Sequence, residues 1–171
     1  YTPWGTVFDC GNTCYRAIHD KKGQDDEWSN GNGSLMRVLP LAFVDSIPDY
    51  KIEEVSAVTH GHSVSKQACV IYVKIAKDLL KGISLKDSIR KNVSENSTFG
   101  RLLKTDELSV NEIKSGGYVV DTLEAAVWCL IHTGSYRECV LKAVNLGADT
   151  DTTAAVAGGL AGILYGYEQI P

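Results

Sequence analysis

Apolar residues recur at three- and four-residue spacing along much of the chain, which is the pattern of helices that bury one face. The clearest stretch predicts a helix that ends before Gly82. Its apolar positions are Cys69, Tyr72, Val73, Ala76, Leu79 and Leu80. Helical periodicity of this kind dominates wherever the pattern is clear, so helices are expected to form most of the fold.

Two further helices are marked by signals at both ends. Residues 121–131 begin with Asp-x-x-Glu in the spacing of a capping box, continue with apolar residues on one face, and are followed by Gly134. Residues 135–144 begin with Ser-x-x-Glu in the same spacing, and Gly147 is expected to close that helix.

Shorter helices are predicted at residues 12–20, 34–45, 50–60 and 84–94. Pro40 falls inside the second of them and must either kink it or mark a boundary, because proline removes a backbone donor.

Strand signals are nearly absent from the chain. Tyr118-Val119-Val120 is the one β-branched run that includes an aromatic residue, and it is too short to pair convincingly. The pattern therefore predicts an all-α fold in which the loops between helices converge on one site.

The last predicted helix, residues 153–165, has small residues at four-residue spacing: Ala154, Gly158 and Gly162. This face would permit close approach of another backbone, which favours a central position in a helical bundle. The apolar run is shorter than the roughly 18–20 residues that span a bilayer, so a membrane helix is not expected.

The composition is that of an ordinary globular protein. A chain of 171 residues, 44% hydrophobic and 22% charged, suits one domain spanning residues 1–171. The formal net charge of −4 argues against nucleic-acid and anionic membrane partners. Five scattered cysteines lack the pairing of a structural zinc site, which favours reduced thiols and a cytoplasmic location.

The candidate chemistry is concentrated just before the last helix. Asp149, Asp151 and Thr152 offer only oxygen donors, which suit Mg²⁺, Mn²⁺ or Ca²⁺ better than Zn²⁺. One Asp and one Thr are also explained as helix caps. Two carboxylates in three residues repel each other, however, and a single cap needs one of them, so the second favours a cation.

A glycine turn precedes the first predicted helix. Asp9, Gly11 and Asn12 stand in an Asp-x-Gly-Asn-Thr sequence, where Gly11 allows close approach of a backbone or ligand. Two interpretations are open: an Asx turn with Asn12 capping the helix, or side chains that contact a ligand.

Gly31-Asn32-Gly33-Ser34 would expose consecutive backbone N–H groups at a helix start, a geometry that attracts anions such as pyrophosphate. The alternative is a plain glycine loop with Ser34 as the cap. Arg37, one turn later, is expected to pair with a structural carboxylate rather than with phosphate.

Two more positions have both a structural and a ligand interpretation. His60 follows Thr59 near the end of a helix, where an imidazole can interact with the helix dipole or face a ligand. Tyr118 follows the flexible residues 115–117 and either stacks on a ribose or base, or packs half-buried.

Five stretches, in order, resemble motifs of the ADP-ribosylglycohydrolase family. They are Phe8–Thr13, Gly31–Arg37, Thr59-His60, Ser115–Ala126 and Asn145–Gly162. The resemblance extends over nearly the whole chain. The Gly-Tyr-Val-Val-Asp-Thr-Leu sequence is most similar to the branch that reactivates dinitrogenase reductase.

The resemblance implies an all-α domain of this family and a role for each matching residue. Asp149, Asp151 and Thr152 would be ligands of a binuclear Mg²⁺ or Mn²⁺ centre, and Asp9 would act beside it, with a proton relay as one role. The substrate-binding residues would be Gly11, Asn12, Asn32, Gly33, Ser34, His60 and Tyr118.

The family's opening region, with a Thr-Asp-Asp motif and an upstream acidic residue, has no counterpart in this sequence, which begins at Tyr1. On this interpretation the chain is the C-terminal major part of the family domain, N-terminally truncated, and its own activity is in doubt. Asp25-Asp26-Glu27 follows Gln24 rather than Thr and is interpreted as a solvated loop.

Three functions are therefore considered. The leading hypothesis is a metal-dependent hydrolase that removes ADP-ribose from a modified protein side chain or cleaves a related conjugate. The second is a non-catalytic ADP-ribose-binding or structural protein on the same scaffold. The third is a helical interaction domain without a ligand, which the paired aspartates argue against.

Overall fold

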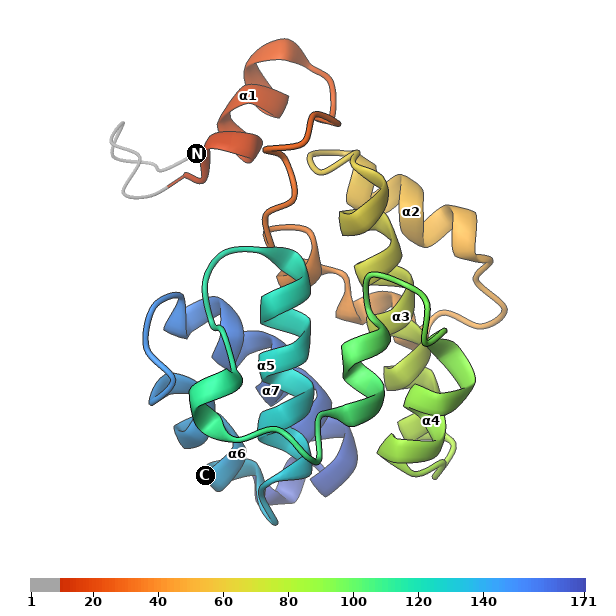
Figure 1. The fold of residues 1–171 in the computed structure, drawn as a ribbon. Coiled ribbons are helices and arrows are strands. Elements are labelled where there is room, and N and C mark those ends of the chain that lie inside the picture. The colour runs from red at the N-terminus through yellow and green to blue at the C-terminus, as the bar shows by residue number, and fades with distance from the viewer. Residues whose placement is uncertain (1–9) are drawn as a thin grey trace.

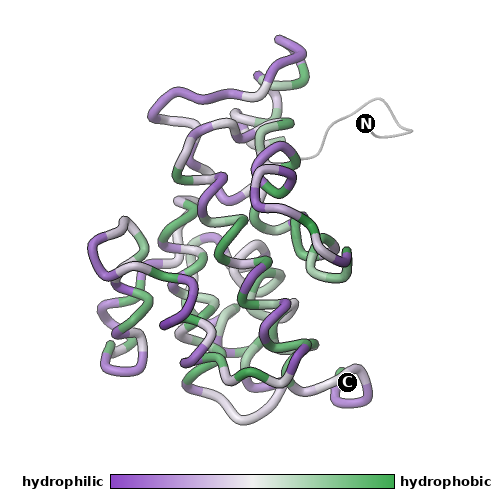
Figure 2. The backbone as a smooth tube through the Cα atoms, turned by 90° about the vertical axis from the view of Figure 1, so that its right-hand side faces the viewer, coloured by the Kyte–Doolittle hydropathy of each residue, from purple (hydrophilic) through white to green (hydrophobic). Residues whose placement is uncertain are grey.

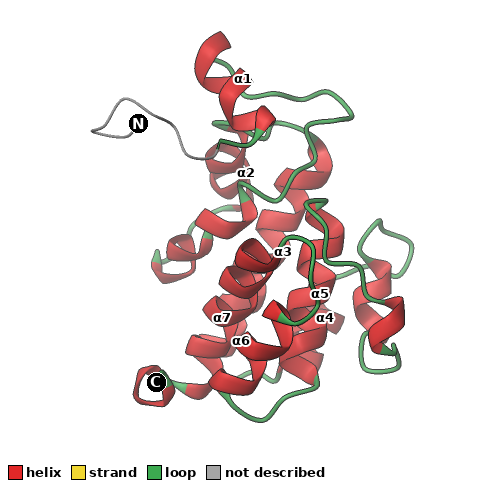
Figure 3. Ribbon diagram, turned by 90° about the vertical axis from the view of Figure 1, so that its left-hand side faces the viewer, coloured by secondary structure: helices red, strands yellow, loops and turns green. Residues whose placement is uncertain are grey.

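The computed structural model describes residues 10–171, which form seven α-helices, five short 3₁₀-helices and no strand (Figures 1 and 3). The α-helices are α1 (Asn12–Asp20), α2 (Asp49–Ala57), α3 (Ser63–Leu80), α4 (Leu85–Asn92), α5 (Val119–Ile131), α6 (Tyr136–Val144) and α7 (Thr150–Tyr165). The 3₁₀-helices are η1 (Leu35–Arg37), η2 (Leu39–Phe43), η3 (Gly100–Lys104), η4 (Val110–Glu112) and η5 (Tyr167–Gln169). The prediction of an all-α fold is confirmed.

Helix α5 lies at the centre of the core, because every residue from Thr122 to Leu130 is buried. A helix that is buried on all sides needs neighbours around it, and α5 packs against α3, α6 and α7. Helices α2 and α4 pack against α3, whereas α1 lies apart from the bundle at the top of Figure 1. Hydrophobic segments gather in the helical bundle and hydrophilic ones in the outer loops (Figure 2).

The predicted ends of α3 and α6 are confirmed. Helix α3 ends at Leu80, and Gly82 has a φ of 76°, a conformation that favours glycine. Helix α6 begins after Ser135, whose hydroxyl accepts a hydrogen bond from the backbone N–H of Glu138. The Glu138 carboxylate accepts from the N–H of Gly134 rather than from that of Ser135, so one half of the capping box forms.

The predicted start of α5 is wrong by two residues. The helix begins at Val119, so Asp121 lies in its first turn and not at the cap. The backbone N–H of Val119 donates to the carbonyl of Asn30 at 3.0 Å, so the tertiary structure satisfies a donor that a side-chain cap would otherwise serve. The Tyr118-Val119-Val120 run therefore starts a helix and pairs only through the single bridge between Gly31 and Tyr118.

The predicted helix at 34–45 is not an α-helix. It is divided into η1 and η2, with Pro40 near the start of η2, where a missing N–H is tolerated. The boundary that Pro40 indicated is thus present, and both short segments pack against α3.

Helix α7 begins three residues earlier than predicted and ends at Tyr165 as predicted. Gly158 and Gly162 face side chains, chiefly that of Tyr136, so the expected backbone approach does not occur on this face. The tight contact is at Gly159, where an added Cβ would lie 2.6 Å from Leu39 Cδ2 and 2.7 Å from the Tyr72 hydroxyl.

Two findings concern the predicted cellular setting. Among residues 10–171, no helix is both long enough and apolar enough to cross a membrane. The five cysteines carry free thiols, and burial raises the pKa of Cys129 to about 12 and that of Cys139 to about 11.

The contact at Gly159 predicts opposite effects for two glycines of the same helix. Gly159→Ala should lower the free energy of unfolding by about 1–3 kcal/mol, because the new methyl group displaces Leu39 or Tyr72. Gly162→Ala has no neighbour closer than 3.9 Å and should be neutral or stabilising by up to about 1 kcal/mol through helix propensity. Urea denaturation followed by circular dichroism measures both, and equal effects would contradict the packing argument.

Candidate functional site

A cleft of about 370 Å³ opens where α1, the loop before η1, the residue His60 and the start of α7 meet. Eight residues singled out from the sequence line it. They are Gly11, Asn12, Asn32, Gly33, His60, Asp149, Asp151 and Thr152. The volume is that of a small-molecule site, and charged and amide groups converge on it.

Four further residues line the cleft that the sequence interpretation did not select: Thr13, Cys14, Gly31 and Met36. Apart from the thiol of Cys14, none of these residues has a side chain that by itself indicates catalysis or metal binding. Three of them lie inside the motif segments 8–13 and 31–37, and that is the signal that could have found them.

Asp149 occupies the N-cap position of α7, but its side chain makes no capping hydrogen bond. Its Oδ2 accepts a hydrogen bond of 2.7 Å from Nδ2 of Asn32 instead. Asp151 and Thr152 follow in the first turn of the same helix, so two carboxylates and a hydroxyl lie at one end of the cleft. Helix capping alone therefore does not account for this cluster.

The charge of Asp149 is stabilised by its surroundings. Burial by itself would raise the pKa of this carboxyl group. The hydrogen bond from Asn32, together with the nearby polar groups of Thr152 and Asp151, outweighs burial, so the pKa of Asp149 is lowered and the group is ionised at neutral pH. The positive end of the α7 dipole acts in the same direction.

Residues 115–117 hold both sides of the cleft through their backbone carbonyls. The carbonyl of Ser115 accepts from the backbone N–H of Asp149 at 2.9 Å, and that of Gly117 accepts from the N–H of Asn32 at 3.0 Å. The N–H of Asn32 is thus already bonded, which removes one donor from the row of N–H groups expected to bind an anion.

The turn that presents Asp149 has unusual backbone geometry. Gly147 has a φ of 83° and Ala148 a φ of 53°, and the second value is strained for a residue with a side chain. The Ser115 hydroxyl donates to the carbonyl of Gly147 at 3.0 Å, so the same segment that holds Asp149 also holds this turn.

His60 forms the floor of the cleft, with 2% of its surface exposed. Its Nδ1 lies 2.7 Å from the Thr59 hydroxyl, and its ring lies against Gly33, where an added Cβ would be 2.8 Å from Cε1. Burial, assisted by the positive charge of Arg37, lowers the pKa of His60 to about 4. The imidazole is therefore neutral at neutral pH, so it does not use a positive charge to interact with a helix dipole.

Ser34 and Arg37 serve the structure around the cleft. Ser34 is fully buried, does not line the cleft, and accepts hydrogen bonds from Ser56 and Cys69 without capping η1. Arg37 donates to the backbone carbonyls of Gly33, Val55 and Ser56. The expectation that Arg37 pairs with a carboxylate is wrong, because these carbonyls lie within reach of its guanidinium group.

Tyr118 lines a second cleft of about 390 Å³, which shares Gly31 with the first. It is 42% exposed, and the same cleft is lined by Trp28, which is 90% exposed. Trp28 was missed in the sequence because it stands in a polar loop without a motif. A tryptophan this exposed, on a cleft that adjoins the first one at Gly31, is a candidate ligand contact.

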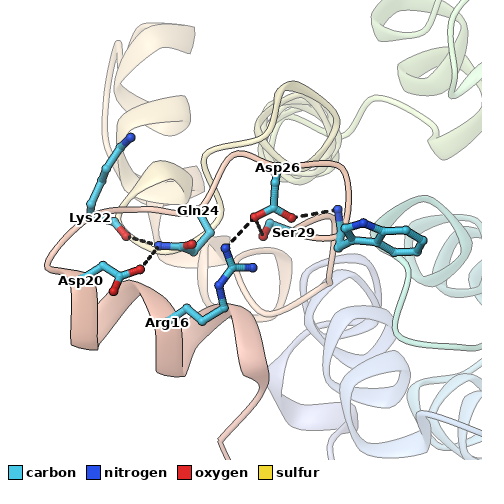
Figure 4. A network of polar contacts seen from close by, with 7 residues as sticks. Arg16, Asp20, Lys22, Gln24, Asp26 and Ser29 are labelled. Carbon is cyan, nitrogen blue, oxygen red and sulfur yellow. Dashed lines mark hydrogen bonds and ion pairs between the residues drawn. The ribbon is translucent and has the colours of Figure 1, made fainter.

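A polar network holds the loop that carries Trp28 (Figure 4). One carboxylate oxygen of Asp26 accepts from Arg16 of α1 at 2.9 Å and from the Ser29 hydroxyl at 3.1 Å. The other accepts from the backbone N–H of Trp28 at 3.0 Å. The acidic run at 25–27 is therefore not simply a solvated loop, since Asp26 organises the turn.

Gly11 and Asn12 lie at the start of α1. Gly11 is the N-cap residue and has open space where a Cβ would be, and Asn12 is the first helical residue, so Asn12 does not cap the helix. Asp9, the expected catalytic residue, lies outside the residues that the structure describes.

The donor set of the cleft fits one side of a hard cation's coordination shell. Asp149, Asp151 and Thr152 offer two carboxylates and a hydroxyl, the oxygen ligands that Mg²⁺ and Mn²⁺ prefer. Six-coordinate binding requires further oxygens from water, substrate or other groups. Within residues 10–171, no group of three or more His, Cys, Asp and Glu side chains is placed to hold a metal ion.

A larger cleft of about 510 Å³ lies elsewhere, between α7, η2 and the C-terminal residues. Its lining is apolar and includes Leu39, Phe43 and Ile170 with the small residues of α7, but no charged side chain. The smaller cleft is the candidate site, since it brings together carboxylate, amide and imidazole groups from four of the motif segments.

Comparison with known proteins agrees with the motifs. The model of the family described as ADP-ribosylglycohydrolase matches residues 1–171. The ADP-ribosylarginine hydrolase Tri1 of Serratia proteamaculans is 32% identical over 98% of this chain and 50% of its own length. The ADP-ribosyl-[dinitrogen reductase] glycohydrolase of Rhodospirillum rubrum is 30% identical over 95% of this chain and 58% of its own.

A solved structure has the same fold. It is titled "ADP-ribosylglycohydrolase-related protein complex" and aligns with a TM-score of 0.70 and 26% identity, over 93% of this chain and 59% of its own. The chain thus spans between about half and three fifths of the length of these relatives.

The neutral state of His60 predicts that acidification destabilises the fold. The unfolded imidazole binds a proton near pH 6.5, whereas the folded one resists until about pH 4. The free energy of unfolding should therefore fall by at most about 3 kcal/mol as the pH is lowered from 6.5 to about 4. In urea titrations, His60→Gln should lose less stability than the unmodified protein between pH 6.5 and 4.5.

His19→Gln, on the exposed surface of α1, is the matched control: it also removes one imidazole, whose ion pair with Asp20 is exposed, so it should change the pH dependence far less than His60→Gln does. Burial raises the pKa of Asp121 and Glu124, which acts in the opposite sense but equally in every variant. Parallel curves for His60→Gln and the unmodified protein would contradict the assignment.

Proposed function

The chain belongs to the ADP-ribosylglycohydrolase family, and we propose that the protein hydrolyses the bond between ADP-ribose and a modified protein side chain at the cleft formed by Asn32, His60 and the start of α7. The observation that carries the proposal is the convergence of two carboxylates and a buried amide on one small cleft. The names of the relatives, an ADP-ribosylarginine hydrolase and an ADP-ribosyl-[dinitrogen reductase] glycohydrolase, support a protein-linked ADP-ribose as the substrate.

Asp149, Asp151 and Thr152 would hold Mg²⁺ or Mn²⁺ in this cleft. Such an ion supplies Lewis-acid stabilisation of oxygen atoms and lowers the pKa of water bound to it. The lowered pKa of Asp149 supports this role, since a metal ligand must be ionised. The repulsion between the two aspartates also favours a cation between them.

The chain's own residues would bind and orient the ribose. Asn32 keeps its carbonyl oxygen available to accept from a hydroxyl group, because its amide nitrogen donates to Asp149 and Thr122. The neutral His60 offers a hydrogen-bonding ring nitrogen without introducing a positive charge beside the cation. Asp9 remains our candidate for proton transfer by family resemblance.

Trp28 and Tyr118 would bind the adenine base. Both are exposed aromatic side chains on a cleft that adjoins the proposed metal site through Gly31. An aromatic surface on a cleft adjoining the ribose site suits a nucleotide that extends from one cleft into the other. Their separation from the carboxylates also keeps the base away from the reacting bond.

A non-catalytic ADP-ribose-binding protein is the second candidate function. The described residues supply only part of a six-ligand shell, which favours binding without turnover for the chain as given. Tight binding of ADP-ribose with no release from a modified protein would support this alternative.

We place the protein in the cytoplasm on the basis of its free, scattered cysteines.

Replacing Asp151 tests the metal site. In the whole protein, Asp151→Asn should weaken Mn²⁺ binding by about 10-fold or more and lower hydrolysis of an ADP-ribosylated protein in parallel, because a charged ligand is lost. Isothermal titration and release of ADP-ribose measure the two effects. Asp49→Asn removes an exposed acid from the first turn of α2 and is the matched control. Unchanged Mn²⁺ affinity in Asp151→Asn would exclude this residue as a ligand.

Replacing Trp28 tests the adenine site. Trp28→Ala should weaken ADP-ribose binding by about 5- to 100-fold, the range expected for a lost base stack, and should leave binding of ribose 5-phosphate unchanged. Thermal stability should also be unchanged, since Trp28 is exposed. Tyr167→Ala, an exposed aromatic residue outside this cleft, is the control. An equal loss of affinity for ribose 5-phosphate would show that Trp28 does not act through the adenine base.

A further inference from the structure

Thr122 lies behind the cleft and does not line it. It is fully buried in the first turns of α5, and its hydroxyl oxygen accepts a hydrogen bond of 2.9 Å from Nδ2 of Asn32. The same amide nitrogen donates to Oδ2 of Asp149 at 2.7 Å. Two bonds from one amide thus connect the central helix to the candidate metal ligand.

The direction of these bonds is determined by local chemistry. The Thr122 hydroxyl has one proton, and the backbone carbonyls of Gly116 and Tyr118 both lie 3.1 Å away to accept it. Bonding back to the carbonyl four residues earlier is common for threonine in a helix. Its lone pairs are therefore left to accept, and Asn32 must turn its NH₂ group toward them.

We propose that Thr122 is a positioning residue, which fixes the Asn32 amide and through it the orientation of the Asp149 carboxylate. If the amide were reversed, its oxygen would face two acceptors at once, so Thr122 and Asp149 together exclude that state. With the amide held by the buried α5, the Asp149 carboxylate has a fixed partner for Oδ2, and the same carboxylate lines the cleft. The link to metal binding rests on the proposed function, but the geometry does not.

Groups that orient a metal ligand change metal affinity without touching the metal. The test compares Thr122→Val, which keeps the shape and β-branching but removes the acceptor, with Thr122→Ser, which keeps the hydroxyl. Thr105→Val is the matched control, since it removes a buried hydroxyl that donates to the Leu102 carbonyl and has no bond to Asn32 or Asp149. All variants are made in the whole protein.

The first measurement is NMR of the Asn32 side-chain amide without metal. We expect slow exchange with water in the unmodified protein and in Thr122→Ser, and exchange at least about 10-fold faster in Thr122→Val. The second is titration with Mn²⁺, where Thr122→Val should bind about 10-fold more weakly and Thr122→Ser nearly normally. Thr105→Val should lose stability and keep both properties.

An unchanged Asn32 amide signal in Thr122→Val would overturn the proposal. If Thr122→Val does not fold, fast exchange of the Asn32 amide protons in the unmodified protein would overturn it as well, and slow exchange with normal behaviour of Thr122→Ser would support it. If the unmodified protein binds no Mn²⁺ while its Asn32 amide responds to Thr122→Val, positioning is supported and the proposed metal site fails. The two ideas are thereby separated.

Discussion

The hydrogen bond from the Asn32 amide to the Asp149 carboxylate joins two loops that are 117 residues apart, and the arrangement of the cleft depends on it. On one side of this bond, the glycines that flank Asn32 lie against the His60 ring. On the other side, the bond orients the carboxylate at the start of α7. A buried polar network of this kind is stable only when each member has a partner, and residues 115–122 supply those partners from the central helix and the segment before it.

Burial favours the neutral form of both His60 and Asp149, which line the same cleft, but the two groups reach different charge states. His60 receives little compensation for its burial and is neutral, whereas Asp149 receives hydrogen bonds and is ionised. The cleft therefore combines negative oxygens with a neutral imidazole. This balance of charge suits a cation and a sugar, and it would be lost if His60 carried a proton.

Local signals in the sequence predicted most of the helices, since a buried face, a capping serine or a glycine stop acts over a few residues. Helices α1 and α6 illustrate this, with bounds close to those expected, and α3 ends before Gly82 as expected. The errors arose where tertiary partners replaced local ones. The carbonyl of Asn30 binds the first N–H of α5, so the predicted cap at Asp121 was unnecessary, and Pro40 divided the segment at 34–45 into two 3₁₀-helices.

The sequence by itself determined the all-α class, the family motifs and the oxygen character of the candidate metal ligands, because each depends only on the type and spacing of residues close together in the chain. The tertiary structure decided what each candidate does. In the folded chain, Ser34 and Arg37 make hydrogen bonds to other protein groups, and Trp28 and Tyr118 line the same cleft. Thr122 accepts a hydrogen bond from Asn32. The physical reason is that hydrogen-bond partners and burial depend on contacts between residues far apart in the chain, which periodicity and spacing do not contain.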